Sequence, residues 1–418
     1  GTVLARSVGR GSGSRRTFTR RYPTGPLFSH AVGYNFISKG RAGLERSRND
    51  ELTGKESEFG SIFSQLQSED REGQDVTTTL DPRAQRVALQ ALGGRKGSVV
   101  ALDPRSGAVK VMASVPGFDP TALRSPRTFS ALNRDRDAPL FNRATQSGYP
   151  PGSTFKVVTA IAALDSGRFT PSSSLSGRNG IEISGVPLNN DGGESFGVID
   201  LTTALTQSVN VVWAQVAEQL GKETMGRYMK RLGFNAEPQI DLPSDQLRPS
   251  GEYRNGKALS PTSRFVDVGR MAIGQDKLNV TPLQMAMVAA AVANDGKLMR
   301  PRLTRRVVDV DGRTVEEVEP EVQSTVMSAA AARQLGQMMS RVVQEGTGTA
   351  AALSGIDVAG KTGTAEVDRP CGPNQLWFIA FAPTERPRVA IAVTVECGTG
   401  FGGTVAAPIA KQVMEALL

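Results

Sequence analysis

Three short polar motifs in a fixed order constrain this chain more strongly than its composition does. They are Ser153-Thr154-Phe155-Lys156, Ser208-Val209-Asn210 and Lys361-Thr362-Gly363. The chain contains no second Ser-x-x-Lys and no second Lys-Thr-Gly, whereas Ser-x-Asn occurs again at Ser47-Arg48-Asn49. If the three motifs act together, the fold has to bring distant segments to one place.

The residues around Ser153 predict the start of a buried helix. Pro150-Pro151-Gly152 comes first, and prolines are tolerated before a helix but not inside one. Residues 157–164 are apolar almost all round, and Gly167 closes the run. Ser153 is therefore expected at the helix N-terminus with Lys156 one turn on, where the amine can deprotonate the hydroxyl and free backbone N–H groups favour an oxyanion. For an isolated pair, a helix cap and a surface lysine would be the commoner interpretation.

The second motif opens another predicted helix, because residues 211–217 are mostly apolar. The hydroxyl of Ser208 is a candidate relay for a proton between Lys156 and a leaving amine. Asn210 carries both a donor and an acceptor, for a substrate amide and for Lys156. Taken alone, this motif would be explained equally well by helix capping.

The third motif lies in a predicted strand, residues 358–366, whose glycines allow a substrate backbone to approach closely. Lys361 and the hydroxyls of Thr362 and Thr364 suit a C-terminal carboxylate. Lys361 is also a candidate for the cation that, together with burial, keeps Lys156 neutral, since a lysine has an ordinary pKa of about 10.4. For the tripeptide alone, a simple turn remains an alternative.

The histidine and cysteine content argues against the main rival chemistries. His30 is the sole histidine, and the two cysteines, Cys371 and Cys397, are not in Cys-x-x-Cys spacing. A Ser-His-Asp hydrolase needs an imidazole beside its serine, and a zinc site usually needs two or more His or Cys ligands. We therefore expect no metal and no cofactor, a lysine as the base, and a structural or surface role for His30.

Length and charge fit a protein with more than one domain. The chain has 418 residues and a net charge of +8, and residues 1–50 carry ten Lys and Arg against Glu45 and Asp50. This basic start is expected to be a solvated arm near anionic lipid headgroups, not a nucleic-acid-binding face. The longest apolar run, residues 285–293, is far shorter than the roughly 18 residues that a membrane span needs.

Together the motifs resemble those of the class B penicillin-binding proteins, in particular the actinobacterial members. Residues 22–34 and Gly43-Leu44-Glu45 are similar to the family's N-terminal pedestal, and the resemblance is strong over 77–418. Nothing in the chain resembles a glycosyltransferase domain, which favours class B over the bifunctional class A. One departure is Gly274-Gln275-Asp276, where the family more often has Gly-Gln-Gly.

The resemblance implies an α+β fold, in which a five-stranded antiparallel sheet is flanked by helices, with a helical subdomain and a smaller pedestal. The expected domains are a truncated pedestal or dimerisation region, 1–75, and a transpeptidase domain, 76–418. The sheet is predicted to combine a hairpin (97–102 and 108–113) with three later strands (358–366, 376–382 and 389–396). Three helices are predicted outside the motifs. The first starts within 77–82 and ends at about Leu92, the second spans 281–294, and the third begins at about Val405. Most of the middle of the chain is also expected to be helical.

The resemblance also implies a serine D,D-transpeptidase that cross-links peptidoglycan stem peptides ending in D-Ala-D-Ala through an acyl-enzyme on Ser153, with β-lactams as inhibitors. In the family, the backbone N–H groups at Ser153 and Thr364 form the oxyanion hole, and Lys361, Thr362, Gly363 and Thr364 bind substrate. The implied location is the extracytoplasmic side of the bacterial membrane, with one anchoring helix before the present N-terminus and a membrane-embedded glycosyltransferase as partner. No nucleic acid is implied.

Two other functions remain open at this stage. A β-lactamase or D,D-carboxypeptidase would hydrolyse its acyl-enzyme, but the Glu-x-x-Leu-Asn motif of class A β-lactamases does not occur between Asn210 and Lys361. A non-catalytic penicillin-binding sensor is the second alternative, and the intact set of motifs argues against it.

Cys371 and Cys397 are predicted to form a disulfide. The family works outside the membrane, where disulfides persist. If Ala382 faces Arg388 across the turn between the last two strands, position 397 falls opposite about position 373. Cys371 is then close enough for the approximately 7 Å limit on the Cα separation of a disulfide.

Overall fold

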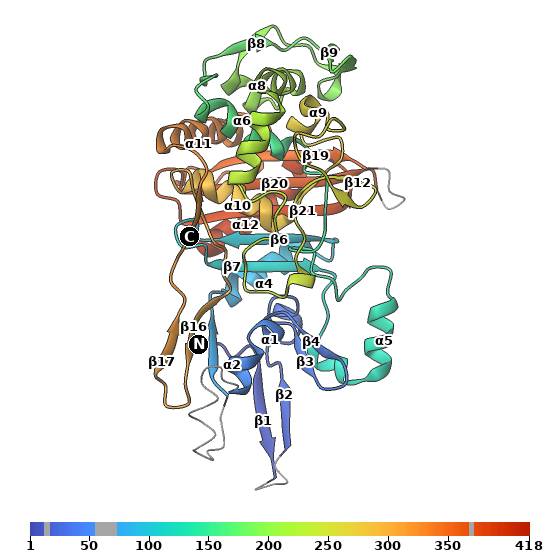
Figure 1. Ribbon diagram of the computed structural model, residues 1–418, viewed down its shortest axis with the longest axis vertical. Helices are drawn as coiled ribbons and strands as arrows, with labels where there is room; N and C mark the ends of the chain where they lie inside the picture. Colours follow the sequence, from blue (N-terminus) through green and yellow to red (C-terminus); the bar gives the residue numbers. More distant parts are fainter. Residues whose placement is uncertain (12–16, 55–72, 368–371) are drawn as a thin grey trace.

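The computed structural model describes residues 1–11, 17–54, 73–367 and 372–418. Figure 1 shows an elongated molecule, with the hairpin β1 (Arg6–Arg10) and β2 (Thr17–Arg21) near one end of the long axis and β8 (Ser174–Ser176) and β9 (Ile181–Ile183) at the other. No helix in the described ranges has the length and apolar character needed to cross a bilayer.

A five-stranded sheet forms the middle of the molecule. Its strand order is β19-β20-β21-β6-β7, and every neighbouring pair is antiparallel. The strands are β6 (Gly97–Leu102), β7 (Val109–Val115), β19 (Ala359–Glu366), β20 (Asn374–Ala382) and β21 (Val389–Gly398). The predicted hairpin and the three predicted late strands are thus confirmed, and they share one sheet.

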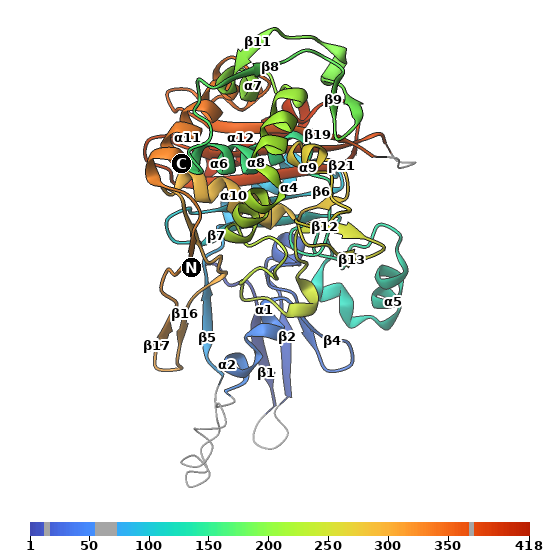
Figure 2. The ribbon, with the colours of Figure 1, turned by 45° about the horizontal axis from the view of Figure 1, so that its top comes forward.

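Helices cover both faces of this sheet, as predicted. The helices α4 (Pro82–Leu92) and α12 (Gly402–Leu417) pack on one face and bury one apolar core there. On the other face, α10 (Pro282–Ala293) packs on β20, β21 and β6, and α6 (Lys156–Asp165), α8 (Asn210–Arg231) and α11 (Ala329–Gln344) extend that second core (Figure 2). Because both faces are covered, β6 is buried at every position and lacks the polar alternation of a half-exposed strand.

Local capping chemistry sets where these helices begin. Asp81 accepts hydrogen bonds from the backbone N–H groups of Arg83 and Ala84, so α4 begins at Pro82, whereas Thr77 and Thr78 belong to strand β5 (Asp75–Thr78). Thr281 caps α10 through the N–H of Gln284. The predicted helix that ends at about Leu92 is confirmed. It begins at Pro82, the last residue of the segment 77–82 within which its start was predicted.

The middle of the chain is less helical than predicted. It contains α7 (Leu201–Thr206) and α9 (Val268–Ala272), but also several two- to five-residue strands in small sheets. Besides β8 and β9, these strands are β10 (Val186–Leu188), β11 (Val198–Asp200), β12 (Gly251–Arg254), β13 (Lys257–Ala258), β14 (Leu278–Asn279), β15 (Lys297–Met299), β16 (Thr304–Val308), β17 (Thr314–Glu317) and β18 (Val322–Thr325). Strands this short carry too few residues for a period-two pattern to be recognised.

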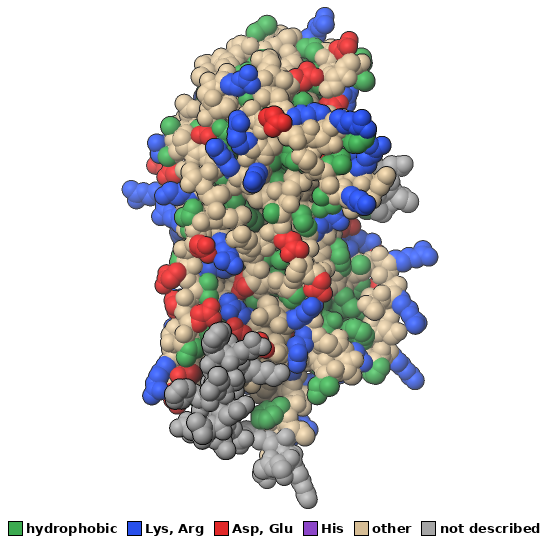
Figure 3. All heavy atoms as spheres, in the orientation of Figure 1, with side chains coloured by type: hydrophobic (Ala, Val, Ile, Leu, Met, Phe, Trp, Pro, Cys, Tyr) green, Lys and Arg blue, Asp and Glu red, His purple; other side chains and the backbone are tan. Residues whose placement is uncertain are grey.

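The N-terminal part contributes short elements that lie below the sheet in Figure 1. They are β3 (Tyr34–Phe36), β4 (Gly40–Ala42), α1 (Leu44–Ser47) and α2 (Asn49–Thr53), and the later helix α5 (Pro126–Arg134) packs beside them through the contact of Phe129 with Tyr34. Strand β5 pairs with β16, so a segment near the N-terminus is hydrogen-bonded to one more than two hundred residues later. On the face seen in Figure 3, basic and acidic side chains are interspersed.

The predicted register of the last hairpin is wrong by one residue. Ala382 faces Val389, and the backbone N–H of Arg388 closes the turn onto the carbonyl oxygen of Ala382. Further along, Leu376 faces Val395 and Asn374 faces Gly398, so Glu396 and Cys397 together lie opposite the single residue 375. A bulge of this kind inserts one extra residue on one strand, and it has no signature in the local pattern here.

Candidate active site

Ser153 lies in a 3-10 turn, Gly152–Phe155, that runs directly into α6. Gly152 has a φ of 53°, and a Cβ there would lie 2.8 Å from the carbonyl oxygen of Thr364. A Cβ on Gly363 would lie 2.7 Å from the carbonyl oxygen of Pro151. Glycines at these two positions therefore allow the Ser153 turn to pack directly on β19, so the first and third motifs are in contact.

The Gly274-Gln275-Asp276 segment packs against the backbone of this turn at Gly152. Gly152 donates its backbone N–H to the carbonyl oxygen of Gly274 at 3.1 Å. A Cβ at Gly274 would lie 1.9 Å from the carbonyl oxygen of Gly152, so only glycine fits. Asp276, at the position where the family more often has glycine, adopts a positive φ of 66°.

Lys156 is fully buried, and its amine points to the second motif. Its Nζ donates to the carbonyl oxygen of Ser208 at 2.6 Å, to Oδ1 of Asn210 at 2.6 Å and to Oγ of Ser208 at 3.2 Å. Ser153 Oγ has no hydrogen-bond partner among the described residues. Lys156 follows Ser153 by one turn, as predicted. Its amine, however, is hydrogen-bonded to Ser208 and Asn210.

Ser208 is the meeting point of the three motifs. Its Oγ accepts a hydrogen bond from Lys156 Nζ and another from Lys361 Nζ, at 2.9 Å. Because the hydroxyl accepts twice, its own proton is free to be donated. Ser208 has a φ of 58°, unusual for a residue with a side chain, and it comes immediately before the N-cap of α8, Val209. The helix predicted to open at this motif is confirmed, and it begins at Asn210.

Burial of the two lysines changes their protonation. Burial lowers the pKa of Lys156 well below its ordinary value, the nearby charge of Lys361 lowers it further, and Asp191 acts in the opposite direction. Burial also lowers the pKa of Lys361, to about 7. The shift of Lys156 favours its neutral form, which a lysine base requires, whereas Lys361, with a pKa of about 7, stays partly protonated at neutral pH.

The threonines of the third motif are held by specific partners. Strand β19 is an edge strand of the main sheet. The Oγ1 atoms of Thr362 and Thr347 are 2.6 Å apart, and Oγ1 of Thr364 accepts the backbone N–H of Gly402 at the start of α12, at 3.1 Å. The hydroxyls are thus fixed beside an open strand edge and close to Lys361.

Several residues that position the site carry no motif. Trp377 donates its indole N–H to the carbonyl oxygen of Pro150, and Glu396 accepts hydrogen bonds from Tyr149 and from Arg143 at 2.8 Å. These contacts fix the residues that immediately precede Ser153 in the chain, and they join segments far apart in sequence. The only local signal was the position of Tyr149 and Pro150 immediately before the Ser153 turn.

Asn210 is held in a similar way. Its Nδ2 donates to the carbonyl oxygen of Asn189 at 3.1 Å, and Asn190 accepts the N–H of Val211 in the first turn of α8. This loop therefore orients the amide that contacts Lys156.

His30 is buried far from this chemistry, not on the surface. Its Nε2 lies 2.8 Å from the carbonyl oxygen of Pro139, and burial lowers its pKa to about 4. Within the described ranges, no three or more His, Cys, Asp or Glu side chains are grouped so that they could hold a metal ion.

Cys371 lies outside the described residues, so its bridge to Cys397 stays a prediction. The neighbouring Gly372 packs on Cys397: a Cβ at Gly372 would lie 2.2 Å from the carbonyl oxygen of Cys397. Cys397 itself has a φ of 55° and sits at the bulge in β21. The residue after Cys371 is therefore in direct backbone contact with the predicted partner.

Comparisons with known proteins agree with this geometry. Residues 97–415 match the penicillin-binding protein transpeptidase domain, and residues 1–76 match the penicillin-binding protein A dimerisation domain. The chain is 34% identical to the peptidoglycan D,D-transpeptidase PbpA of Mycolicibacterium smegmatis, over all of this chain and 87% of that one.

Solved structures give the same result at the level of the fold. The ceftriaxone acyl-enzyme complex of penicillin-binding protein A from Mycobacterium tuberculosis superposes with a TM-score of 0.88 at 32% identity, covering 100% of this chain and 96% of that one. A D,D-transpeptidase domain from Eggerthella lenta superposes with a TM-score of 0.85 at 33% identity, covering 100% and 95%. The chain therefore belongs to the penicillin-binding protein transpeptidase family.

Proposed function

We propose that this peptidoglycan D,D-transpeptidase forms its acyl-enzyme on Ser153, with Lys156 as the general base. The observation that carries the assignment is the position of Ser208 Oγ, which accepts hydrogen bonds from both buried lysines. That arrangement places a hydroxyl able to pass a proton on between the two amines, and burial lowers the pKa of Lys156, which favours its neutral form one turn from the candidate nucleophile. A serine without a nearby histidine needs such an alternative base.

In the proposed acylation, Lys156 Nζ takes the proton of Ser153 Oγ as that oxygen attacks the carbonyl carbon between the two D-alanines of a stem peptide. Rotation of the lysine away from Asn210 brings it to Ser153, and catalytic hydrogen bonds often form only in the substrate complex. The backbone N–H groups of Ser153 and Thr364 receive the oxyanion. Ser208 relays that proton from Lys156 to the leaving amine of D-Ala. The amine of a second stem peptide then attacks the ester, its proton passes through Lys156 to Ser153 Oγ, and Ser153 is released.

The third motif is proposed to bind the C-terminal carboxylate of the donor peptide. Lys361 supplies the positive charge, Thr362 and Thr364 supply hydroxyls, and Gly363 leaves room for the peptide backbone along the edge of β19. β-Lactams carry a carboxylate in an equivalent place and are expected to acylate the same serine. Asn210 is proposed to contact the substrate amide while it holds Lys156.

The biological setting follows from the family. Cell-wall transpeptidases work on the extracytoplasmic side, and this protein is placed there with them. We further propose a pedestal or dimerisation region over residues 1–75, a transpeptidase domain over 76–418, and a membrane-embedded glycosyltransferase as a partner. The single anchoring helix stays a prediction.

The alternative hydrolytic functions differ from transpeptidation in the lifetime of the acyl-enzyme. With no dedicated deacylating carboxylate identified in the sequence, the penicilloyl-enzyme is expected to persist. Turnover of many β-lactam equivalents per second would instead identify a β-lactamase. A non-catalytic sensor would acylate but give no cross-linked product from stem peptides.

Labelling with a fluorescent penicillin tests the nucleophile. Ser153→Ala is expected to lose all covalent label while it keeps a native circular dichroism spectrum. Ser166→Ala, at the other end of α6, is the matched control and should label like the unmodified protein. Equal labelling of the Ser153→Ala variant would refute the assignment.

A further inference from the structure

A cavity lined by none of the catalytic residues lies beside strand β7 and the turns at one end of the main sheet. It has a volume of about 610 Å³ and is lined by residues of β5, β7 and β16, by the β6–β7 and β20–β21 turns, by the N-cap of α4 and by the end of α12. Strand β7 is the edge strand farthest from β19 in the sheet order, and none of the lining residues belongs to the three motifs. Its volume is in the range of small-molecule sites, about 300–1,000 Å³.

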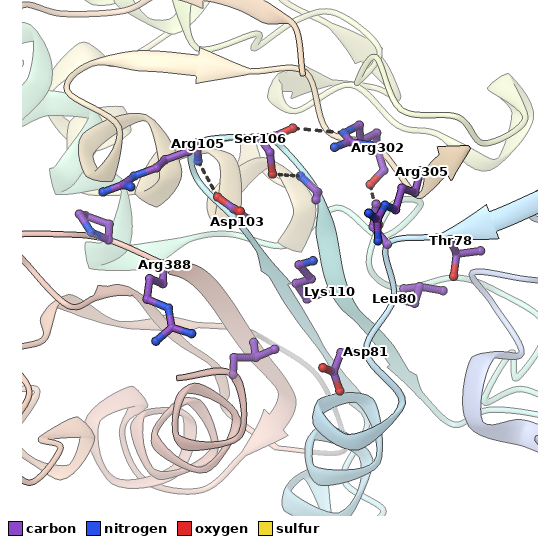
Figure 4. Close-up of a pocket in the computed structure, with 14 residues that line it drawn as sticks. Thr78, Leu80, Asp81, Asp103, Arg105, Ser106, Lys110, Arg302, Arg305 and Arg388 are labelled. Atoms are coloured by element: carbon purple, nitrogen blue, oxygen red, sulfur yellow. Dashed lines mark hydrogen bonds between the residues drawn. The ribbon is translucent and has the colours of Figure 1, made fainter. Parts of the chain in front are cut away.

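Five basic side chains line this cavity: Arg105, Lys110, Arg302, Arg305 and Arg388. Figure 4 shows Lys110 near the centre, with Arg302 and Arg305 on one side and Arg388 on the other. They come from three separate parts of the chain, and none of them forms an ion pair with a described carboxylate.

The two carboxylates in the lining are already engaged. Asp81 accepts the backbone N–H groups of Arg83 and Ala84 at the start of α4, and Asp103 accepts the N–H of Arg105 in the turn between β6 and β7. They therefore hold the backbone of the cavity wall and leave an excess of three positive charges facing the space.

Two of the five basic side chains are fixed by hydrogen bonds to the protein, and the other three, Arg105, Lys110 and Arg305, have no side-chain hydrogen bond to a described residue. Arg302 donates to the carbonyl oxygens of Ser106 and Thr304, and Arg388 donates to that of Leu418. Such a set combines preplaced guanidinium groups with mobile cations that can close on a ligand.

The chemistry of the lining defines the ligand. A wall of cations with few apolar side chains disfavours a hydrophobic molecule and favours one that carries several anionic oxygens. Guanidinium groups pair bidentately with phosphate, and a phosphate offers more acceptor oxygens per unit volume than a carboxylate. We propose that this cavity binds a ligand carrying two or more linked phosphate groups, either soluble or as the headgroup of a lipid.

Titration calorimetry with inorganic pyrophosphate tests the proposal on the whole chain. Saturable binding is expected for the unmodified protein, and the Lys110→Gln/Arg305→Gln double variant should bind at least about tenfold more weakly. Arg306→Gln is the matched control, because Arg306 is the exposed neighbour of Arg305 on β16 and does not line the cavity. It removes one positive charge from the same strand and should bind within about twofold of the unmodified protein.

Further arms separate the outcomes. Absence of saturable binding, or an equal loss in Arg306→Gln, would overturn the site, and citrate binding as tightly as pyrophosphate would overturn the phosphate assignment. Competition by phosphatidylcholine vesicles containing a polyprenyl pyrophosphate, but not by phosphatidylcholine alone, would support a lipid headgroup, and lack of competition a soluble phosphate. Penicillin labelling of Ser153 should be the same in all these variants, so a failure here leaves the catalytic assignment untouched.

Discussion

Trp377 donates its indole N–H to the carbonyl oxygen of Pro150 at 2.9 Å, which ties the second strand of the sheet to the segment that leads into the Ser153 turn. Trp377 is fully buried, and it faces Gly363 across the β19–β20 pair. Its ring packs against that of Tyr149 at a centroid distance of 6.1 Å. One side chain thus couples the nucleophile turn to the strand that carries Lys361.

Trp377→Phe should slow acylation severalfold and lower stability by about 1–3 kcal/mol. The smaller ring keeps most of the packing but leaves the carbonyl oxygen of Pro150 without its donor, and an unpaired buried acceptor costs about that much. Thermal unfolding and the rate of penicillin labelling measure the two effects. Trp213→Phe is the control, because Trp213 is equally buried but its Nε1 has no hydrogen-bond partner in the described structure. Slowed acylation in both variants would mean that lost ring volume, not the hydrogen bond, is responsible.

The sequence predicts the parts of the site that are local in the chain. The Ser153-to-Lys156 spacing, the helix that begins at Asn210 and the strand around Lys361 each follow from side-chain periodicity and punctuation by proline and glycine. The same signals locate α4, α6, α8, α10, α12 and the five strands of the sheet, because each is long enough to show a pattern, whereas α11 is covered only by the general expectation of a helical middle.

Contacts that depend on tertiary packing could not be predicted in this way. The orientation of Lys156 towards Asn210, the Trp377–Pro150 bond and the bulge opposite residue 375 are set by how separate segments meet. The short strands between residues 174 and 325 were missed for a related reason, since two to five residues carry little periodicity. The basic cavity unites segments that are unremarkable on their own.

Lys156→Ala should reduce the acylation rate at least about a hundredfold, the usual scale for loss of a general base. Raising the pH should not restore the rate, because the missing group is a positioned base and not merely a proton acceptor. Stopped-flow or gel-based labelling with a fluorescent penicillin gives the rate. Lys222→Ala, in the middle of α8, where Lys222 Nζ donates to the carbonyl oxygen of Ser263 and to no motif residue, is the control and should acylate normally. A rate within a few-fold of the unmodified protein would exclude Lys156 as the base.

The pKa of Lys361, lowered to about 7, predicts an alkaline loss of acylation. Below pH 7 the free enzyme keeps Lys361 charged for the ligand carboxylate, and above pH 7 that charge is lost, so the second-order acylation rate should fall as pH rises. Lys361→Arg keeps a positive charge throughout, since a guanidinium stays protonated. Its pH profile should therefore lack the fall near pH 7, whatever its absolute rate. The same fall in both proteins would assign it to another group.

Glu252 is fully buried in β12, and burial, with the nearby charge of Asp276, raises its pKa from 4.5 to about 8. Between these two values the folded protein binds more protons than the unfolded chain, so this group's contribution to stability is lost as pH rises from about 4.5 to about 8. Glu252→Gln removes that loss. Its melting temperature relative to the unmodified protein should rise by about 2 °C or more between pH 5 and pH 8.5. The exposed Glu223→Gln should give a difference independent of pH, and a pH-independent difference for Glu252→Gln would contradict the shifted pKa.

The predicted Cys371–Cys397 disulfide would fix the loop that follows the Lys361 strand. Gly372 already lies on the backbone of Cys397, which places the two chain segments side by side at the bulge in β21. Intact-mass measurement of the denatured protein with a thiol-alkylating reagent, without reductant, should therefore find no alkyl addition, and two additions after reduction. Cys397→Ser should take up one alkyl group without reduction, because it frees Cys371, and it should lower the melting temperature, since a disulfide is typically worth about 2–4 kcal/mol. Two additions to the unreduced parent protein would rule the bridge out.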